Sequence, residues 1–443
     1  MLQSPLWKLR MECAILDRSQ LNSIVDEWND LARRSADDNA YYTPSYAMPL
    51  LRNILPAQDV RFATIRLHGR LVAFMPFVVS GRVAALFYGP SSAWSSVYTF
   101  TCTPLLDRDC PNDAAAALID LLSTVHQGEW KIPAINIKGA AGGALVTALT
   151  RLGAPWAHEF AFNRATLRPT RSFDDHMRET VSPKRRKDLE RNRRRLEKVG
   201  TVEHKVFKTG DGLRSAIESF LALEARGWKG ENGTALACHQ NTAEFARQAF
   251  NDGANSDSRR ADVLFLNGIP IAVNLTIIAG KTGFTAKCAY DENYSSYSPG
   301  LLLEVEFLRQ YLAEKWADQI DGGTAGNHVI DGLWGGYTEV ADLVFSLAMV
   351  NASRRLGRLQ TIDSMKQRLK IQVKELVERA QTGIDLVKHV ASPPLQPEAN
   401  RPSFPDAKRS NAAQAGQVRQ DCVKISIPHQ PRPAPERHAR GGG

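Results

Sequence analysis

The residues best suited to chemistry surround a predicted turn from a strand into a helix, Ser295-Ser-Tyr-Ser-Pro-Gly-Leu-Leu302. The first backbone N–H groups of a helix lack partners within it, and with the helix dipole they form a site for an anion such as a pyrophosphate. Gly300 would let a ligand approach the backbone, and Pro299 suits the first helical position because no N–H is needed there. The alternative interpretation is an ordinary Ser-Pro helix cap.

Just upstream, the run from Lys287 to Tyr294 ends a predicted strand in a cluster of phenols and carboxylates. Transfer from a thioester to an amine needs a base to remove the ammonium proton and an acid to protonate the leaving thiolate, and both side-chain types can serve. Asp291 and Tyr297 are placed for such roles. The alternative is that Asp291-Glu292-Asn293 is only a polar turn.

A third candidate is the run from Lys184 to Lys198, which holds nine basic and three acidic residues. On a helix, Leu189 and Leu196 fall on one side, one heptad apart, with the basic side chains around them. This density favours contact with a polyanion, either an acidic glycan, cofactor phosphates or RNA, over a merely solvated face.

Familiar catalytic and targeting signals are missing from the sequence. It contains no P-loop, no dinucleotide-binding glycine pattern, no H-E-x-x-H motif and no G-x-S-x-G nucleophile elbow. The histidines show no metal-ligand spacing and the six cysteines are scattered, so we expect neither a metal nor a disulfide. No apolar run is long enough to cross a membrane and no signal peptide is recognised, so we expect a cytoplasmic location.

Hydrophobic periodicity predicts the elements that must position these residues. Before residue 172 we expect helices over 20–35, 114–125 and 144–152, a hairpin of strands 60–67 and 71–79, and a strand over 132–137. After it we expect helices over 183–199, 213–225, 242–249 and 301–316, a three-strand meander over 261–266, 269–279 and 284–290, and a strand over 318–321. Strands interleaved with helices indicate an α/β or α+β fold, and the similar order in the two parts suggests a weak duplication.

The formal net charge of +9 is carried by the C-terminal part of the chain. Residues 351–443 hold 17 Lys/Arg and 8 Asp/Glu, so residues 1–350 are neutral overall. Apolar spacing predicts a basic amphipathic helix over 351–390, and the proline-rich segment 391–443 is predicted to be disordered because it cannot bury enough apolar surface. The predicted organisation is therefore 1–171, 172–350, 351–390 and 391–443.

Taken together, several segments resemble the GNAT-superfamily acetyltransferases called CelD-like, which are associated with bacterial cellulose and exopolysaccharide synthesis. The similarity spans residues 20–345 and rests on the basic helix after Ser182, Leu223-Glu-Ala-Arg-Gly-Trp-Lys-Gly230, Asn267-Gly-Ile-Pro-Ile-Ala272, Ala289-Tyr-Asp-Glu292, Tyr297-Ser-Pro-Gly-Leu-Leu-Leu-Glu304 and Asp321-Gly-Gly323. In the first unit, Trp94-Ser-Ser-Val-Tyr-Thr-Phe100 and Thr103-Pro-Leu-Leu106 are similar to that family too.

The resemblance implies two GNAT-like units in tandem, each a mixed central sheet flanked by helices, related to the FemAB-type transferases. It also implies acetyl-CoA as the donor, bound by the backbone amides of Ser298, Gly300, Leu301 and Leu302, with no metal. The pyrophosphate loop of the superfamily usually starts with Arg or Gln and ends with Gly or Ala; Tyr297 and Leu302 stand at those positions here.

The resemblance predicts an acyl-CoA-dependent N- or O-acyltransferase acting on a sugar or cell-envelope precursor. Asp291 or Glu224 would act as the base and Tyr297 as the acid. The residues expected to contact the substrate or a polyanion are Lys184, Arg185, Arg186, Trp228 and Lys229.

Two alternatives stay open. One is aminoacyl transfer from aminoacyl-tRNA, with the basic helix as the tRNA contact. The other is a scaffold without catalysis, which would dock on a polysaccharide synthase complex or an anionic membrane face.

Overall fold

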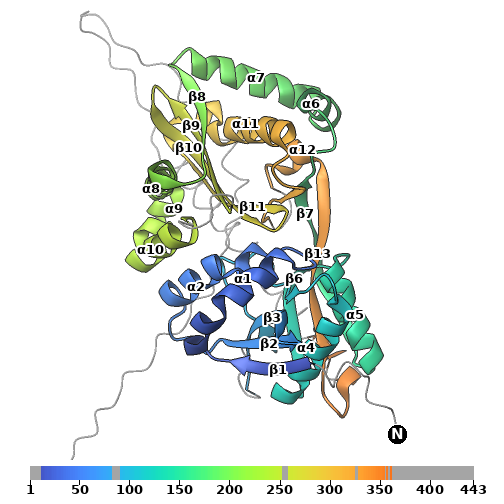
Figure 1. Ribbon diagram of the computed structural model, residues 1–443. Helices are drawn as coiled ribbons and strands as arrows, with labels where there is room; N and C mark the ends of the chain where they lie inside the picture. Colours follow the sequence, from blue (N-terminus) through green and yellow to red (C-terminus); the bar gives the residue numbers. More distant parts are fainter. Residues whose placement is uncertain are drawn as a thin grey trace, which may run out of the picture. The chain divides into compact units, whose positions relative to one another are not determined.

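The computed structural model describes residues 11–81, 90–251, 258–324, 328–354, 356–357 and 360–361, which fold as a mixed α/β structure (Figure 1). The strands are β1 (Met11–Leu16), β2 (Arg61–Leu67), β3 (Arg70–Val78), β4 (Ser91–Ala93), β5 (Leu105–Leu106), β6 (Glu129–Asn136), β7 (Trp156–Leu167), β8 (Val202–Phe207), β9 (Arg259–Leu266), β10 (Ile269–Ala279), β11 (Thr282–Tyr290), β12 (Gln319–Asp321) and β13 (Gly336–Ser346). The α-helices are α1 (Val25–Arg33), α2 (Pro44–Asn53), α4 (Pro111–Val125), α5 (Ala140–Leu152), α6 (Phe173–Thr180), α7 (Pro183–Glu197), α8 (Gly210–Arg226), α9 (Trp228–Glu231), α10 (Gln240–Ala249), α11 (Pro299–Glu314) and α12 (Asp331–Trp334). Short 3-10 helices are η2 (Arg18–Ile24), η3 (Ala40–Tyr42), η4 (Leu236–Cys238) and η5 (Glu292–Tyr297).

Two of the predicted hairpins form where the sequence places residues that tolerate a left-handed backbone. His68 and Gly69 join β2 to β3 with φ of 53° and 77°, and Asn267 and Gly268 join β9 to β10 with φ of 51° and 76°. Turns with two positive φ values match the twist of antiparallel strands, so both sites favour a tight hairpin. The meander β9-β10-β11 is confirmed.

The same strand order occurs twice. In the first half β1, β2, β3 and β4 are antiparallel neighbours, and β4 is parallel to β6, with α4 between them in the chain. In the second half β8, β9, β10 and β11 are antiparallel neighbours, and β11 is parallel to β12, with α11 between them. The duplication suggested by the sequence is therefore present in the topology.

The two halves share strands in one sheet. Strand β13, near the end of the described chain, pairs with β6 of the first half and with β7, and β7 in turn pairs with β12 of the second half. Asp342 of β13 accepts a hydrogen bond from the backbone N–H of Ala134 (2.9 Å) and lies 2.9 Å from Lys131 Nζ. The predicted boundary between residues 171 and 172 stays a prediction, because the sheet continues across it.

Aromatic side chains also join the halves. The Tyr46 ring of α2 packs edge-on against Phe245 of α10, with ring centres 5.5 Å apart, and Tyr41 packs in the same way against Phe284 of β11 at 5.6 Å. Arg259 donates a hydrogen bond to the Ser45 hydroxyl (3.0 Å). First-half side chains therefore lie against the second-half sheet.

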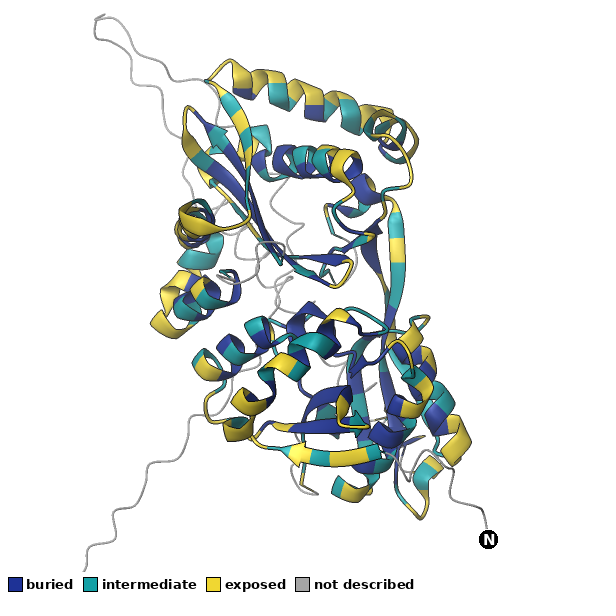
Figure 2. Ribbon diagram, in the orientation of Figure 1, coloured by how far each residue is buried: buried dark blue, intermediate teal, exposed yellow. Residues whose placement is uncertain are grey.

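Helices cover both faces of the second-half sheet, as Figure 1 shows. Alternate residues of β9 point to opposite faces: Ala261 and Val263 share a core with α8, whereas Leu264 and Leu266 share a core with α11. Helix α7 lies over α11 and buries its two predicted leucines, Leu189 and Leu196 (Figure 2).

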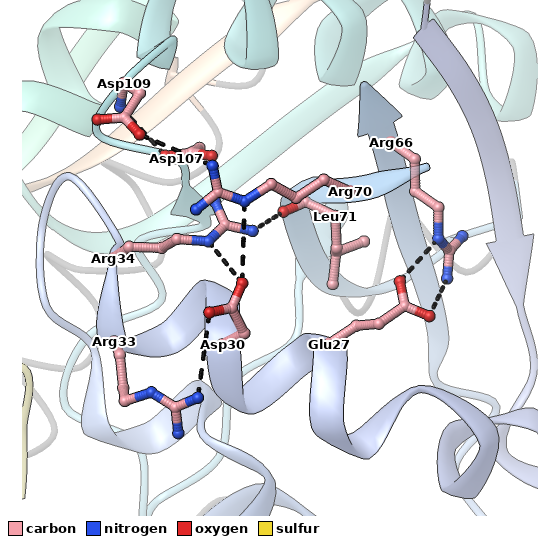
Figure 3. A network of polar contacts seen from close by, with 9 residues as sticks. All are labelled: Glu27, Asp30, Arg33, Arg34, Arg66, Arg70, Leu71, Asp107 and Asp109. Atoms are coloured by element: carbon pink, nitrogen blue, oxygen red, sulfur yellow. Dashed lines mark hydrogen bonds and ion pairs between the residues drawn. The ribbon is translucent and has the colours of Figure 1, made fainter. Parts of the chain in front are cut away.

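In the first half, an ionic network holds α1 against β2 and β3 (Figure 3). Arg34 lies 2.7 Å from Asp30, pairs with buried Asp107 and also donates to a backbone carbonyl of β3. Arg66 of β2 pairs with Glu27 of α1 at 2.9 Å. These charges are already paired with one another, so we assign them a structural role.

The remaining predictions concern the C-terminal residues, membrane-spanning helices and the cysteines. The predicted helix over 351–390 lies mostly outside the described residues, and the tail over 391–443 lies wholly outside them. Within the described ranges, no helix is long and apolar enough to span a membrane. The five described cysteines are free thiols.

Candidate active site

Strand β11 extends beyond the end of its parallel partner, β12. Residues Thr282–Phe284 of β11 pair with Gln319–Asp321 of β12, and β12 then ends. Beyond this point the Thr285 hydroxyl donates to the Asp321 carbonyl (3.3 Å), and Asp321 Oδ1 accepts from the N–H of Gly323 (2.7 Å). The register between β10 and β11 shifts at Ala286, so this stretch of β11 also carries a bulge. From Thr285 on, β11 therefore has no strand partner on this side among the described residues.

Helix α11 begins at the end of β11 through η5. Ser298 adopts a left-handed conformation (φ 54°), and its N–H donates to the Ser295 carbonyl (3.0 Å). The N–H of Leu302 donates back to the Ser298 carbonyl (3.0 Å). By helix geometry the N–H groups of Gly300 and Leu301 are therefore the two without a helical acceptor. Of the four residues predicted to bind the donor, these two have backbone N–H groups left for a ligand, whereas the N–H groups of Ser298 and Leu302 already donate within the chain.

The basic helix α7 lies beside this turn. Asn192 donates to the Ser298 hydroxyl (3.4 Å), and Arg195 donates to the Ser296 carbonyl (3.3 Å). The Arg195 guanidinium also lies over the Tyr297 ring, 5.0 Å from its centre. Tyr297 therefore faces α7, and a cation lies within reach of the anion turn.

Glu224 lies on the opposite face of the sheet, near the end of α8. It is buried; its Oε1 lies 2.8 Å from Lys229 Nζ, and its Oε2 accepts from the N–H of Leu236 at 2.8 Å. Both oxygens are thus occupied, one by a cation. The structure brings two predicted residues, Glu224 and Lys229, into one ion pair, on the opposite side of β11 from Tyr297.

Lys287 of β11 lies next to this ion pair and was not among the predicted residues. Burial lowers its pKa to about 8, with the Lys229 charge adding to the effect and the Glu224 charge opposing it. Its Nζ lies 5.0 Å from the centre of the Tyr98 ring, which comes from the first half. Burial and the Glu224 charge raise the pKa of Tyr98. No spacing rule in the sequence brings residues 98 and 287 together.

The acidic residues after β11 serve the local backbone. Asp291 caps η5 by accepting from the N–H of Asn293 (3.0 Å). Glu292 accepts from the N–H of Trp228 (2.9 Å) and lies against Gly227, where a Cβ would come within 2.8 Å of its Oε1. Glu292 thereby ties α9 to the turn that precedes α11.

The carboxyl of Glu304, which is not among the predicted site residues, is buried on the sheet-facing side of α11. Glu304 accepts from Trp334 Nε1 (2.7 Å) and from Asn274 Nδ2 (3.1 Å). Burial raises the pKa of Glu304 to about 7 despite these two hydrogen bonds, and the Asp262 charge contributes. Glu304 lies one helical turn after Gly300, so it links the start of α11 to β10 and α12.

The basic residues of α7 divide into two sets. Arg185 donates to the Val329 carbonyl (2.6 Å), and Arg193 lies 3.0 Å from Glu306, so both hold α7 on the domain. Lys184 is exposed and Arg186 is half-buried. An outer stripe is exposed along the helix (Figure 2): Lys184, Lys187, Arg191, Arg194 and Lys198.

Metal ligation finds no support in the described part of the chain, where no group of three or more His, Cys, Asp or Glu side chains could hold an ion.

Comparison with known proteins places a GNAT domain in the second half. Residues 183–328 match the family model described as "Acetyltransferase (GNAT) domain", and this segment includes α7, Glu224, Lys287 and the turn at Gly300. No curated protein matches the chain. The match shows a GNAT-type acyltransferase domain and leaves the substrate undetermined.

Similar solved structures include FemX (TM-score 0.49, 12% identity, covering 72% of this chain and 95% of that one) and L-PGS from Bacillus licheniformis (0.46, 13%, 77% and 96%). A third is a tandem GNAT protein from the clavulanic acid biosynthesis pathway (0.39, 13%, 77% and 100%).

Proposed function

We propose that this GNAT-domain chain is an acyl-CoA-dependent N- or O-acyltransferase, with acetyl-CoA as its donor and a sugar or another cell-envelope precursor as its acceptor. The observation that carries the proposal is the end of β11. Three features lie at this end of the strand: the described stretch of β11 without a partner on the β12 side, the N–H groups of Gly300 and Leu301 without a helical acceptor, and the Lys287 cluster, formed by Lys287, Glu224, Lys229 and Tyr98.

The donor side of the site fits a CoA pyrophosphate. Gly300 and Leu301 would donate backbone hydrogen bonds to it, helped by the positive end of the α11 dipole. Tyr290 lies alongside Gly300, where an added Cβ would come within 3.4 Å of its ring, so the missing side chain leaves the backbone approachable. When bound, acyl-CoA supplies an activated acyl thioester.

The acceptor side is formed by Glu224, Lys229, Trp228, Lys287 and Tyr98. Because both Glu224 oxygens already accept hydrogen bonds, we assign Glu224 to orienting Lys229 rather than to removing a proton. Lys287 in its neutral form would accept the proton of the attacking amine or hydroxyl, with Asp291 as the other candidate base. Tyr297, the predicted acid, faces Arg195 on the other side of β11, so we assign it no proton transfer at this cluster.

Calorimetric titration with acetyl-CoA, checked by thermal shift, tests the donor. We expect saturable binding that CoA itself competes for, and release of free thiol when amino sugars or nucleotide sugars are added. A folded protein that binds neither acetyl-CoA nor CoA at millimolar concentration would disprove the proposal.

The exposed stripe of α7 favours a second candidate, aminoacyl transfer from aminoacyl-tRNA. Five cations on one helix face could contact successive phosphates, and such binding weakens steeply as salt rises. A gel shift with tRNA at low and high salt tests this candidate. Absence of a shift at low salt removes it.

A further inference from the structure

We propose that the second half carries another ligand site, a pocket for a small organic anion of about the size of a sugar phosphate. The pocket is bounded by the end of β7, by α6 and by the start of β13. Its volume is about 380 Å³, within the range typical of small-molecule sites.

The positive charge of the pocket lining favours an anionic ligand. Arg168 and Arg171 line the pocket, and the lining contains no Asp or Glu. Arg168 donates to Gln319 (3.2 Å), and Arg171 pairs with Glu179, which lies outside the lining. Each guanidinium has five N–H donors, so both keep donors for a carboxylate or phosphate after these contacts.

The rest of the lining suits a hydroxylated ligand with an apolar face. Thr170, Thr180 and the nearly buried Thr166 carry hydroxyls in the lining, and the half-exposed Tyr337 adds an aromatic ring beside the buried Trp334. Aromatic walls with a few placed polar groups are the usual composition of a small-molecule site. A phosphorylated or carboxylated sugar matches this combination of charge, hydroxyls and rings.

Two adjacent glycines shape the pocket wall. A Cβ on Gly335 would lie 2.4 Å from Thr180 Cγ2, and a Cβ on Gly336 would lie 2.6 Å from the Thr166 carbonyl oxygen. Gly335 also has a positive φ of 70°. Only glycine lets β13 start this close to β7 and α6 without moving them.

The pocket is distinct from the donor turn but is connected to it. Trp334 lines the pocket and donates through Nε1 to Glu304, on the first turns of α11. Trp334 is only 2 % exposed and thus lies between the pocket and Glu304, the residue that holds α11 on the sheet. The pocket shares none of its lining residues with the Gly300 turn or the Lys287 cluster.

Calorimetry on the full chain tests the site with glucose 1-phosphate and glucuronate as anionic probes, glucose as the neutral match, and inorganic phosphate as the anion alone. We expect at least one anionic sugar to bind more tightly than glucose and phosphate, and equally well with CoA present. Arg168→Gln combined with Arg171→Gln should weaken that binding roughly tenfold or more, as loss of charged hydrogen bonds predicts.

Arg178→Gln is the matched control, because Arg178 lies on α6, pairs with Asp175 at 2.9 Å and is outside the lining. It should leave binding unchanged, which separates a local contact from net charge. Binding of neither anionic sugar, equal loss in the control, or competition by CoA would each overturn the proposal. The last outcome would assign the pocket to the donor site.

Discussion

Two properties of the single residue Glu304 determine its protonation state. It is buried among core side chains beneath α11, and it accepts hydrogen bonds from Trp334 and Asn274. The hydrogen bonds favour the charged form, whereas burial favours the neutral form. Since the pKa is raised to about 7, burial wins and the carboxyl keeps its proton in mildly acidic solution.

We therefore expect the stability of the protein to fall as pH rises from about 4.5 to about 7. In this window the unfolded chain has released the Glu304 proton and the folded chain still holds it, so raising the pH favours unfolding. The loss should total about 3 kcal/mol and stay constant at higher pH. Glu304→Gln should remove this loss, measured by urea unfolding across the pH range. Glu190→Gln, at an exposed position of α7, is the control and should keep the wild-type slope.

Lys287 is the second residue whose position predicts a pH effect. If its neutral form is the base, kcat/KM for acyl transfer should rise tenfold per pH unit and level off above about pH 8. Lys287→Arg keeps a cation over Tyr98 but cannot release a proton, so it should lose this limb of the profile. Lys281→Arg, at the exposed turn before the same strand, is the control and should keep this limb of the profile. A wild-type profile in Lys287→Arg would assign the base to Asp291 instead.

Among the elements of the fold, helix α11 and the strand β11 before it together present the proposed donor site. Pro299 occupies the first helical position and Ser298 bends the chain into it, so the N–H groups of Gly300 and Leu301 have no helical carbonyl to which they can donate. Helix α7 stabilises this arrangement through Asn192 and Arg195. The basic helix thus supports the site in addition to presenting charge.

Gly300→Ala separates the function of this element from its stability. An added Cβ would meet only the Tyr290 ring, at 3.4 Å, so we expect no loss of stability and a gain of up to about 1 kcal/mol in helix propensity. The same Cβ would obstruct a pyrophosphate at the backbone, so the Kd for acetyl-CoA should rise several-fold. Gly143→Ala in α5, where a Cβ meets nothing within 4 Å, is the matched control and should leave the Kd unchanged. Equal affinity in the two variants would place the pyrophosphate elsewhere.

At the scale of the whole molecule, the exchange of strands between halves is the dominant feature. Without residues 172–350, β6 and β7 lose β13 between them, and without residues 1–171, β12 loses β7. Each separated half would expose unpaired backbone at a sheet edge and the aromatic side chains around Tyr46 and Phe245. The halves should therefore depend on each other for folding.

Co-expression of fragments 1–171 and 172–350 tests this dependence. We expect the two fragments to copurify as a complex with acetyl-CoA affinity, and either one alone to aggregate or to unfold without cooperativity. A fragment 172–350 that unfolds cooperatively as a monomer would contradict the expectation and support independent units. Light scattering and calorimetric unfolding are sufficient measurements.

Local rules explain why much of this fold could be read from the sequence. The hairpin turns at His68-Gly69 and Asn267-Gly268, the Ser182-Pro183 cap of α7 and the buried pair Leu189 and Leu196 depend on neighbours within a few residues. The turn at Gly300 is of the same kind. The sequence by itself determined these features because backbone preference and short-period burial act over a few residues.

Only the tertiary structure decided which residues meet across the chain. It brought Tyr98 beside Lys287, Trp334 beside Glu304, and β13 between β6 and β7. Such contacts arise because strands pair and side chains pack wherever the sheet closes, independently of distance along the chain. Burial at those contacts shifts the pKa values of Lys287 and Glu304, so this chemistry could not be read from residue types and spacing alone.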